Sequence, residues 1–323
     1  MSVTIRDVAR EAGVSVATVS RVINSKGYLS PAAITKVQLA MEKLNYQPNA
    51  AARRLQGKSS ATIGVILPSI DNPLYSELFE HIEDELSGRH YQTLLCTSKN
   101  NSEKEEEYFK LLKSNQVDGI ITGSHSDFLI EHGNASYPIV SFDRQISKEI
   151  PTVKSDNLAG GRAIAGKVVE RGVKNVLILS GSKEDFYPIN DRVTGMMAVF
   201  NQAGVDVTTS SLEFESSIAL KKLLVGQLIV SRDYDAICCT DDVTAILVKT
   251  CADTMNYHPL ISGYDGSTFI RTFFPELPTV QQPIKEMAEL MVELLIERIK
   301  SPKTRLNSDY TFPVKTNRVH KKA

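Results

Sequence analysis

Long apolar runs are missing from this 323-residue sequence. No stretch approaches the roughly 20 consecutive apolar residues that a membrane-spanning helix needs. The N-terminal segment MSVTIRDVAR also lacks the apolar core of a secretory signal peptide. We therefore expect a cytoplasmic protein without a membrane partner.

Cysteine and histidine are scarce, and neither is spaced for metal binding. The four cysteines are Cys96, Cys238, Cys239 and Cys251, and they form no C-x-x-C pair. The first three lie in apolar, strand-like runs, which favours reduced thiols. The six histidines show no H-x-x-x-H or H-E-x-x-H spacing. We expect neither a metal nor a cofactor.

The charge of the chain is balanced overall but unevenly distributed. The sequence contains 37 basic and 38 acidic residues, for a net charge of −1. Residues 1–60 contain nine bases and three acids, a net charge of +6, which leaves −7 for the remainder. A basic segment on an acidic body is typical of a protein that binds nucleic-acid phosphates. The alternative is an ordinary solvated charge excess.

Residues 4–44 show three short amphipathic segments with helix-capping signals. Thr4 precedes the first segment, with Asp7 as its acidic partner, and Gly13 permits a tight turn. Ser15 caps a second helix that runs to about Ile23, and Ser30–Pro31 starts a third that runs to about Leu44. The inward-facing side chains are Ile5, Val8, Ala9, Val14, Val19, Val22, Ile23, Ile34, Val37, Met41 and Leu44. This pattern predicts a helix-turn-helix unit whose second helix fits the major groove of DNA.

A short, capped segment follows this unit. Asn49 is a good N-cap, Ala50–Ala52 favour a helix, and Gly57 suits its end. A helix of about seven residues is shorter than the roughly 12–15 residues needed for marginal stability in isolation. We therefore expect a hinge helix that folds when two copies meet on DNA.

Thr4–Asn24 and Tyr46–Leu55 resemble the head and hinge of the lactose-repressor/galactose-repressor family of bacterial transcription factors. The resemblance continues through nearly the whole chain. It implies that operator DNA, a pseudo-palindromic duplex, is a partner of this protein. It assigns DNA contacts to Thr4, Ser15, Val16, Ala17, Thr18, Ser20, Arg21, Asn24, Tyr46, Asn49, Ala52, Arg53 and Leu55.

The resemblance also implies different roles for these positions. The family uses the start of the second helix at base edges, which places Val16 and Ala17 there, as in the galactose-type branch. Such small apolar groups contact a thymine methyl, whereas Arg21 pairs best with guanine; a phosphate contact is the alternative for Arg21. Thr18 and Ser20 contact phosphates. Leu55 matches the leucine that wedges into the minor groove and bends the operator, with a core position as the alternative.

The body, residues 61–323, alternates strand-like and helix-like segments. The predicted strands are Ile63–Leu67, Thr93–Cys96, Gly119–Thr122, Ile139–Phe142, Val176–Leu179, Ala236–Cys239, Leu260–Ser262, Thr279–Gln281 and Tyr310–Val314. The predicted helices are Leu74–Leu86, Glu103–Lys113, Leu158–Arg171, Arg192–Ala203, Val243–Ala252 and Ile284–Lys300. Repeated strand–helix units imply parallel sheets covered by helices, and about ten strands exceed one comfortable sheet.

We therefore predict an α/β chain, with a small all-α helix-turn-helix head (1–48), a hinge helix and linker (49–60) and a two-subdomain core (61–323). The core resembles the periplasmic sugar-binding proteins, with parallel sheets flanked by helices. We expect one subdomain to comprise 61–156 with 283–305, and the other 157–282 with 306–323. No leucine heptad tail follows the last strand, which favours a homodimer over a tetramer.

Such a core binds its ligand between subdomains, at the carboxyl ends of the strands. The family positions that touch effector match Tyr75, Asp143, Arg144, Arg192, Phe214, Asp241 and Asp265. Carboxylates and a guanidinium offer paired acceptors and donors to sugar hydroxyls, and an aromatic ring covers a sugar face. For the charged residues the alternative is a helix cap or an ion pair between subdomains. We expect Asp242 to cap its helix.

Two features of the sequence could suggest an enzyme, but neither is supported by its context. Gly161–Lys167 fits G-x-x-x-x-G-K, but Val168 follows where a phosphate loop needs Ser or Thr, and 156–171 reads as one helix. The cleft carboxylates could hydrolyse a glycoside, but such an enzyme needs no basic DNA-binding head. We expect a regulator rather than an enzyme.

The resemblance narrows the function further. The stretches NYQPN, NQVDGIIT, SFDRQI, CTDDVTAI and ISGYDG are similar to repressors of sucrose operons in Gram-positive bacteria. We therefore expect a nucleoid-associated repressor that a small sugar or sugar phosphate releases from its operator. Two alternatives stay open: a global catabolite regulator driven by a phosphoprotein partner, and a solute-binding protein without DNA activity.

Overall fold

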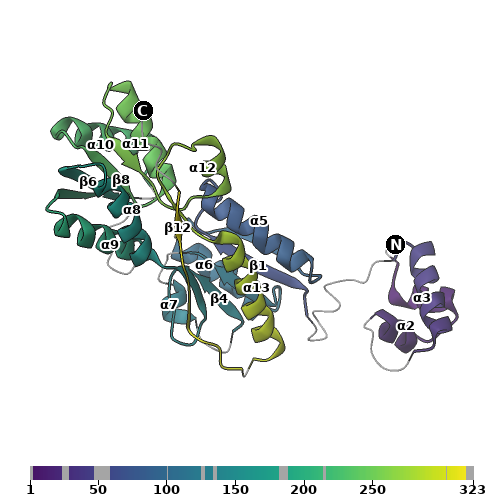
Figure 1. Cartoon of the computed structure of the whole chain (residues 1–323). Coiled ribbons are helices and arrows are strands. Elements are labelled where there is room, and N and C mark those ends of the chain that lie inside the picture. Colours follow the sequence, from purple (N-terminus) through teal and green to yellow (C-terminus); the bar gives the residue numbers. More distant parts are fainter. Residues whose placement is uncertain are drawn as a thin grey trace. The chain divides into compact units, whose positions relative to one another are not determined.

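The computed structural model describes residues 3–23, 29–46, 59–99, 101–124, 128–133, 137–181, 188–213, 216–302 and 304–317. The chain divides into two compact units, residues 1–60 and 61–323 (Figure 1). Six of the predicted contact residues lie outside the described residues: Asn24, Asn49, Ala52, Arg53, Leu55 and Phe214. Within the described residues, no helix is long and apolar enough to cross a membrane.

The first unit contains helices α1 (Ile5–Ala12), α2 (Val16–Ile23) and α3 (Pro31–Lys43), as predicted. Gly13 ends α1 with a φ of 64°, the left-handed conformation that glycine adopts without strain. The three helices pack on one apolar core, whose buried members are Val8, Ala9, Ala12, Val19, Val37 and Ala40. The core therefore fixes α2 with Val19 inward and its opposite side in solvent.

The first subdomain of the core unit is a parallel sheet with strand order β11-β5-β4-β3-β1-β2. Its strands are β1 (Thr62–Leu67), β2 (Gln92–Thr97), β3 (Gly119–Thr122), β4 (Ile139–Phe142), β5 (Thr152–Ser155) and β11 (Asp309–Phe312). Helices α5 (Pro73–Ser87) and α13 (Ile284–Lys300) cover one face, and α6 (Ser102–Lys113) and α7 (Phe128–His132) the other. The central strands β3 and β4 are buried throughout because both faces are covered.

The second subdomain is a parallel sheet with strand order β7-β6-β8-β9. Figure 1 labels its strands β6 and β8. Its strands are β6 (Asn175–Ser180), β7 (Asp206–Ser211), β8 (Ala236–Cys239) and β9 (Leu260–Ser262). Helices α8 (Asn157–Val169) and α9 (Ile189–Gln202) pack on one face. Helices α10 (Ile218–Ser231), α11 (Asp242–Thr254) and α12 (Thr268–Phe273) pack on the other.

The chain passes between the subdomains after β5, after β10 (Val280–Gln281) and between β11 and β12 (Lys315–Thr316). We expected residues 306–323 in the second subdomain, but β11 pairs with β5 in the first sheet. The strand expected at Tyr310–Val314 is β11, which ends at Phe312 because Pro313 has no N–H group and interrupts the run. β12 then pairs antiparallel with β10. Several crossings of the chain join the two subdomains, as is typical of proteins whose two subdomains close by hinge bending.

Candidate functional site

Helix α2 presents a small, mostly apolar surface with one cation. Val16 is 42% exposed, and Ala17 and Arg21 are also exposed, whereas Val19 is fully buried. Ala17 and Arg21 are four residues apart, so their side chains lie on the same face of the helix. The exposed face of α2 therefore consists of the residues that the sequence assigned to base edges.

Several other predicted DNA contacts have structural roles in the head. The Thr4 N–H and hydroxyl both donate to Asp7 Oδ2, at 3.0 and 2.7 Å. Ser15 Oγ accepts from the Thr18 N–H at 3.1 Å and so caps α2. Tyr46 packs against the apolar core of the head. The DNA contacts of these residues, and of the half-buried Ser20, stay predictions.

The core unit contains a cavity of about 410 Å³ between the two sheets. It is lined by Pro68, Ser69, Asp71, Asn72, Leu74, Tyr75, Phe142, Asp143, Pro188, Ile189, Arg192, Ser216, Ser217, Ile218, Lys221, Asp241, Val243, Thr244 and Asp265. Asp143, Asp241 and Asp265 each follow the carboxyl end of a parallel strand. This edge is where α/β sheets bind ligands. Five of the seven predicted effector residues line the cavity: Tyr75, Asp143, Arg192, Asp241 and Asp265.

The Arg192 guanidinium joins the two subdomains at the base of this cavity. Its Nε donates to Asn157 Oδ1 at 2.7 Å, and Nη1 donates to the Thr240 carbonyl at 2.7 Å and to Asp265 Oδ1 at 3.1 Å. Nη2 lies 3.7 Å from Asp143 Oδ2. Asp143 belongs to the first subdomain and Asp265 to the second, so Arg192 binds carboxylates of both. The exposed fraction of the Arg192 side chain is 4%.

Burial controls the protonation of this cluster. It raises the pKa of Asp265 to about 7, although Arg192 opposes the shift. It raises the pKa of Asp143 for the same reason, again against the effect of Arg192. Burial alone would lower the pKa of Arg192, but Asp265 and Asp143 reverse this, so the guanidinium stays charged. The cluster therefore combines a charged guanidinium with two carboxyl groups whose ionisation is disfavoured by burial.

Asp265 makes the stability of the core dependent on pH. The folded chain holds the Asp265 proton up to about pH 7, whereas an ordinary aspartate loses it near 3.8. Since the folded state then binds more protons, stability should fall as pH rises between these values. We expect denaturant titrations to show a loss of stability from pH 5.5 to pH 8 that is smaller in Asp265→Asn. Equal losses in both proteins would contradict this assignment.

The structure contradicts the expectation that Asp242 caps its helix. Asp241, not Asp242, is the N-cap of α11: its Oδ1 accepts from the Thr244 N–H at 2.8 Å. Asp241 has extended backbone angles and Asp242 is already helical, so only Asp241 can cap. Asp242 instead accepts from the Gly266 N–H at 2.7 Å and from the Thr279 hydroxyl at 2.6 Å. It thereby holds the loop that follows β9, while Asp241 both caps α11 and lines the cavity.

Of two further candidates for effector binding, Tyr75 lines the cavity and Arg144 is buried outside the described lining. Tyr75 lines the cavity and contacts Phe142 edge-on, with ring centroids 6.4 Å apart. Burial raises the pKa of Tyr75, so its hydroxyl is protonated and can donate. Arg144 is buried but does not belong to the described lining. An effector contact of Arg144 therefore stays a prediction.

The sequence analysis did not predict two amide side chains, Asn157 and Gln282, that bond to the carboxylates of the cluster. Asn157 Nδ2 donates to Asp143 Oδ1 and Gln282 Nε2 donates to Asp265 Oδ1, both at 2.9 Å. Both residues lie where the chain passes between subdomains. The signal that could have identified them is their position beside a strand end and a crossing.

Comparisons with known proteins agree with both units. Residues 4–49 match bacterial regulatory proteins of the lacI family, and residues 60–269 match the periplasmic binding proteins and sugar binding domain of the LacI family. The sucrose operon repressor of Streptococcus mutans serotype c is 42% identical over 97% of this chain and 98% of its own length.

Solved structures show the same architecture. A periplasmic binding protein/LacI transcriptional regulator from Alkaliphilus metalliredigens, complexed with D-xylulofuranose, is 28% identical, with a TM-score of 0.71 over 80% of this chain and 97% of its own. The lac repressor dimer bound to operator and an anti-inducer is 22% identical, with a TM-score of 0.82 over 98% of each chain, and shows the shared fold. The chain therefore belongs to the lacI family of bacterial regulatory proteins, with a helix-turn-helix head and a core like that of periplasmic binding proteins.

Proposed function

We propose that this DNA-binding repressor of a sugar operon controls genes for sucrose use, and that a small sugar in the cleft releases it from its operator. The observation that carries the proposal is a cleft with buried, paired charges in the same chain as an exposed α2 surface. The assignment to sucrose rests on the similarity to the Streptococcus mutans repressor. The proposed place of action is the cytoplasmic nucleoid, and the relatives are repressors rather than enzymes.

The proposed release follows from the position of Arg192 between the subdomains. A sugar can shift the protein between two arrangements only if it binds one of them more tightly. Hydroxyl groups that bond to Asp143 and Asp265 would hold both subdomains at once, which favours one arrangement of the hinge. We propose that, in a dimer, this arrangement changes the spacing of the two helix-turn-helix heads and lowers their affinity for DNA.

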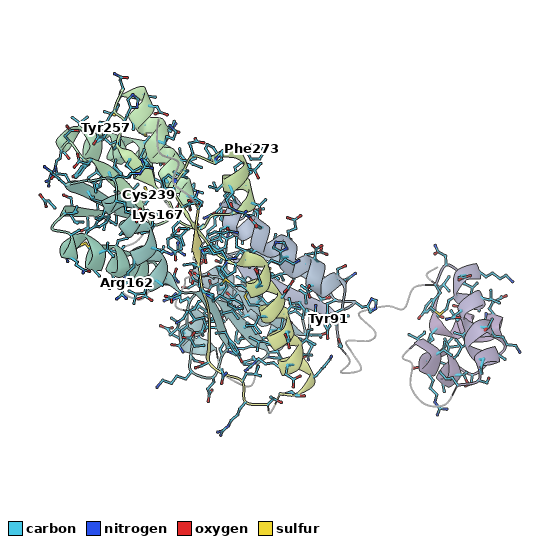
Figure 2. All side chains as sticks on the ribbon, viewed as in Figure 1. Tyr91, Arg162, Lys167, Cys239, Tyr257 and Phe273 are labelled. Carbon is cyan, nitrogen blue, oxygen red and sulfur yellow. The ribbon has the colours of Figure 1, made fainter. Side chains whose placement is uncertain are left out.

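The proposed homodimer is supported by exposed apolar side chains on the second subdomain. Ile218 and Leu223 on α10 are 68% and 58% exposed. Phe269 and Phe273 on α12 are 50% and 65% exposed, and Phe273 is labelled in Figure 2. The centroids of the two phenyl rings lie 4.9 Å apart. Exposed clusters of large apolar groups are typical of protein interfaces. A dimer would present two α2 helices to the two halves of a pseudo-palindrome.

Arg21 provides the test of DNA reading. We expect Arg21→Ala to lose about 1–3 kcal/mol of operator binding free energy and to relax the preference at one base pair in each half-site. The measurement is binding to a panel of operators with single base-pair changes. Lys36→Ala, which removes an exposed charge from α3, is the control that should keep the base preference. An equal loss by Arg21→Ala on every sequence would show that Arg21 contacts phosphate.

The dependence on the head tests the alternative of a solute-binding protein. A chain that lacks residues 1–60 should still bind sugar, because residues 61–323 form a compact unit. It should not bind operator DNA. Operator binding by the truncated chain would contradict the proposed function.

A further inference from the structure

The charges around the cleft are unequal. Within the described lining, Asp71, Asp143, Asp241 and Asp265 are acidic, and Arg192 and Lys221 are basic. The acids outnumber the bases, and three of them are buried. The surroundings of a ligand in this cavity are therefore negative when the carboxyl groups are ionised.

The Arg192 guanidinium is already committed to the protein. Nε and Nη1 donate to Asn157, the Thr240 carbonyl and Asp265, and Nη2 lies 3.7 Å from the Asp143 carboxylate. The guanidinium also stacks on Tyr264, with 3.8 Å between its central carbon and the ring centroid. An arginine held by two carboxylates is a weak anchor for a further anion, because a second negative partner must compete with the first two.

The second cation of the described lining belongs to a different element from the carboxylate cluster. Lys221 is half-buried on the first turns of α10, whereas Asp143 and Asp265 lie at strand ends beside Arg192. A phosphate group carries a charge of about −1.5 to −2 at pH 7. Within this cavity it would meet more carboxylates than cations, in surroundings where water screens charge poorly.

The carboxylates that line the cavity can accept hydrogen bonds from the hydroxyl groups of a ligand instead. An ionised carboxylate has about four acceptor sites on its two oxygens. Asp241 uses one site of Oδ1 on the Thr244 N–H and one of Oδ2 on the Thr244 hydroxyl. The two bonds described for Asp265 come from Arg192 and Gln282, and both end on Oδ1. Acceptor sites remain for the hydroxyl groups of a ligand, and each new donor relieves the repulsion among the carboxylates.

We propose that the effector is an uncharged sugar, not its phosphate ester. This inference rests on the proposed function and chooses between the two effector classes that the sequence left open. Carboxylate oxygens accept the ring hydroxyl groups, and Tyr75 lies along the apolar side of the ring. Within the described lining the carboxyl groups outnumber the cations, so a phosphate ester of the same sugar binds more weakly: its charge repels each carboxylate that is ionised, and Arg192 is already paired.

The test is calorimetric titration of the full chain with two matched pairs: fructose with fructose 6-phosphate, and sucrose with sucrose 6-phosphate. We expect at least one uncharged sugar to bind and its ester to bind at least about tenfold more weakly. An ester that binds as well as its parent sugar, or better, overturns the inference. If such an ester also releases operator DNA, the proposed function stands and only the choice of effector class fails. If no compound of either class binds, both proposals fail.

Asp241→Asn tests the charge argument itself. Asparagine also caps helices, so α11 should stay folded while the cavity loses one negative charge. We expect the variant to bind the uncharged sugar a few-fold more weakly and to discriminate less against the ester. The same discrimination in the variant and the original protein would contradict an electrostatic origin.

Discussion

Arg192→Ala is expected to destabilise the core by about 3–5 kcal/mol, because it leaves buried carboxylates without their cation. The loss should be larger at pH 8 than at pH 5.5, since burial raises the pKa of Asp265 to about 7 and protonation removes part of the unpaired charge. Denaturant unfolding of the full chain at the two pH values measures both effects. The variant should also lose its response to sugar, because Arg192 binds both subdomains.

Arg162→Ala is the matched control. Arg162 is an exposed arginine on α8 (Figure 2), and its loss should change stability by no more than about 0.5 kcal/mol. If Arg192→Ala were as mild as Arg162→Ala, the carboxylates would not depend on the guanidinium. The account of the cluster as a charge-paired link between the subdomains would then be wrong.

Gly161→Ala should destabilise the second subdomain by about 1–3 kcal/mol or more, because α8 and α9 lie too close for a side chain at this position. A Cβ atom on Gly161 would lie 2.1 Å from the Arg192 carbonyl oxygen. Backbone atoms cannot rotate away, so α9 and the Arg192 that it carries must shift. We expect a lower midpoint of thermal unfolding together with weaker sugar binding.

Gly166→Ala, five residues later on the same helix, is expected to have the opposite effect. A Cβ atom on Gly166 meets no atom within 4 Å. Alanine in a helix, at a position with room for its Cβ atom, stabilises by about 0.5–1 kcal/mol relative to glycine. Equal effects of the two substitutions would show that helix propensity, and not the close contact, governs α8.

This pair also explains the sequence signal at Gly161–Lys167. The glycine that imitates a phosphate loop is a packing residue inside α8, whose N-terminus Asp156 caps at 2.9 Å through the Ala159 N–H. The prediction of a single helix there is confirmed. A motif of spaced glycines cannot by itself distinguish a phosphate loop from a close helix–helix contact.

The parts of the molecule that depend on local signals could be predicted from the sequence. Ser15 and Ser30 begin helices where expected, since caps act within one helical turn. Most buried strands were predicted because both faces of a parallel sheet require continuous apolar runs. The cleft acids could be placed together because parallel strands end at one edge of a sheet.

The parts that depend on distant partners could not be predicted. The strand β7, Asp206–Ser211, is almost entirely polar and lies at a sheet edge, so the sequence gives no apolar signal for its pairing with β6. Helix α10 distributes apolar residues around its circumference, which hides its helical period. The pairing of Gln282 with Asp265 depends on a crossing between subdomains that local patterns do not reveal.

We propose that sugar in the cleft controls the affinity of the head for DNA. The most direct measurement is fluorescence anisotropy of a labelled pseudo-palindrome, selected by the full chain from random duplexes, during titration with fructose or sucrose. We predict tight, salt-sensitive binding that an uncharged sugar reverses, and a Gly166→Ala control that responds like the original protein. Operator binding that no sugar or sugar phosphate reverses would contradict the account and favour control by a protein partner.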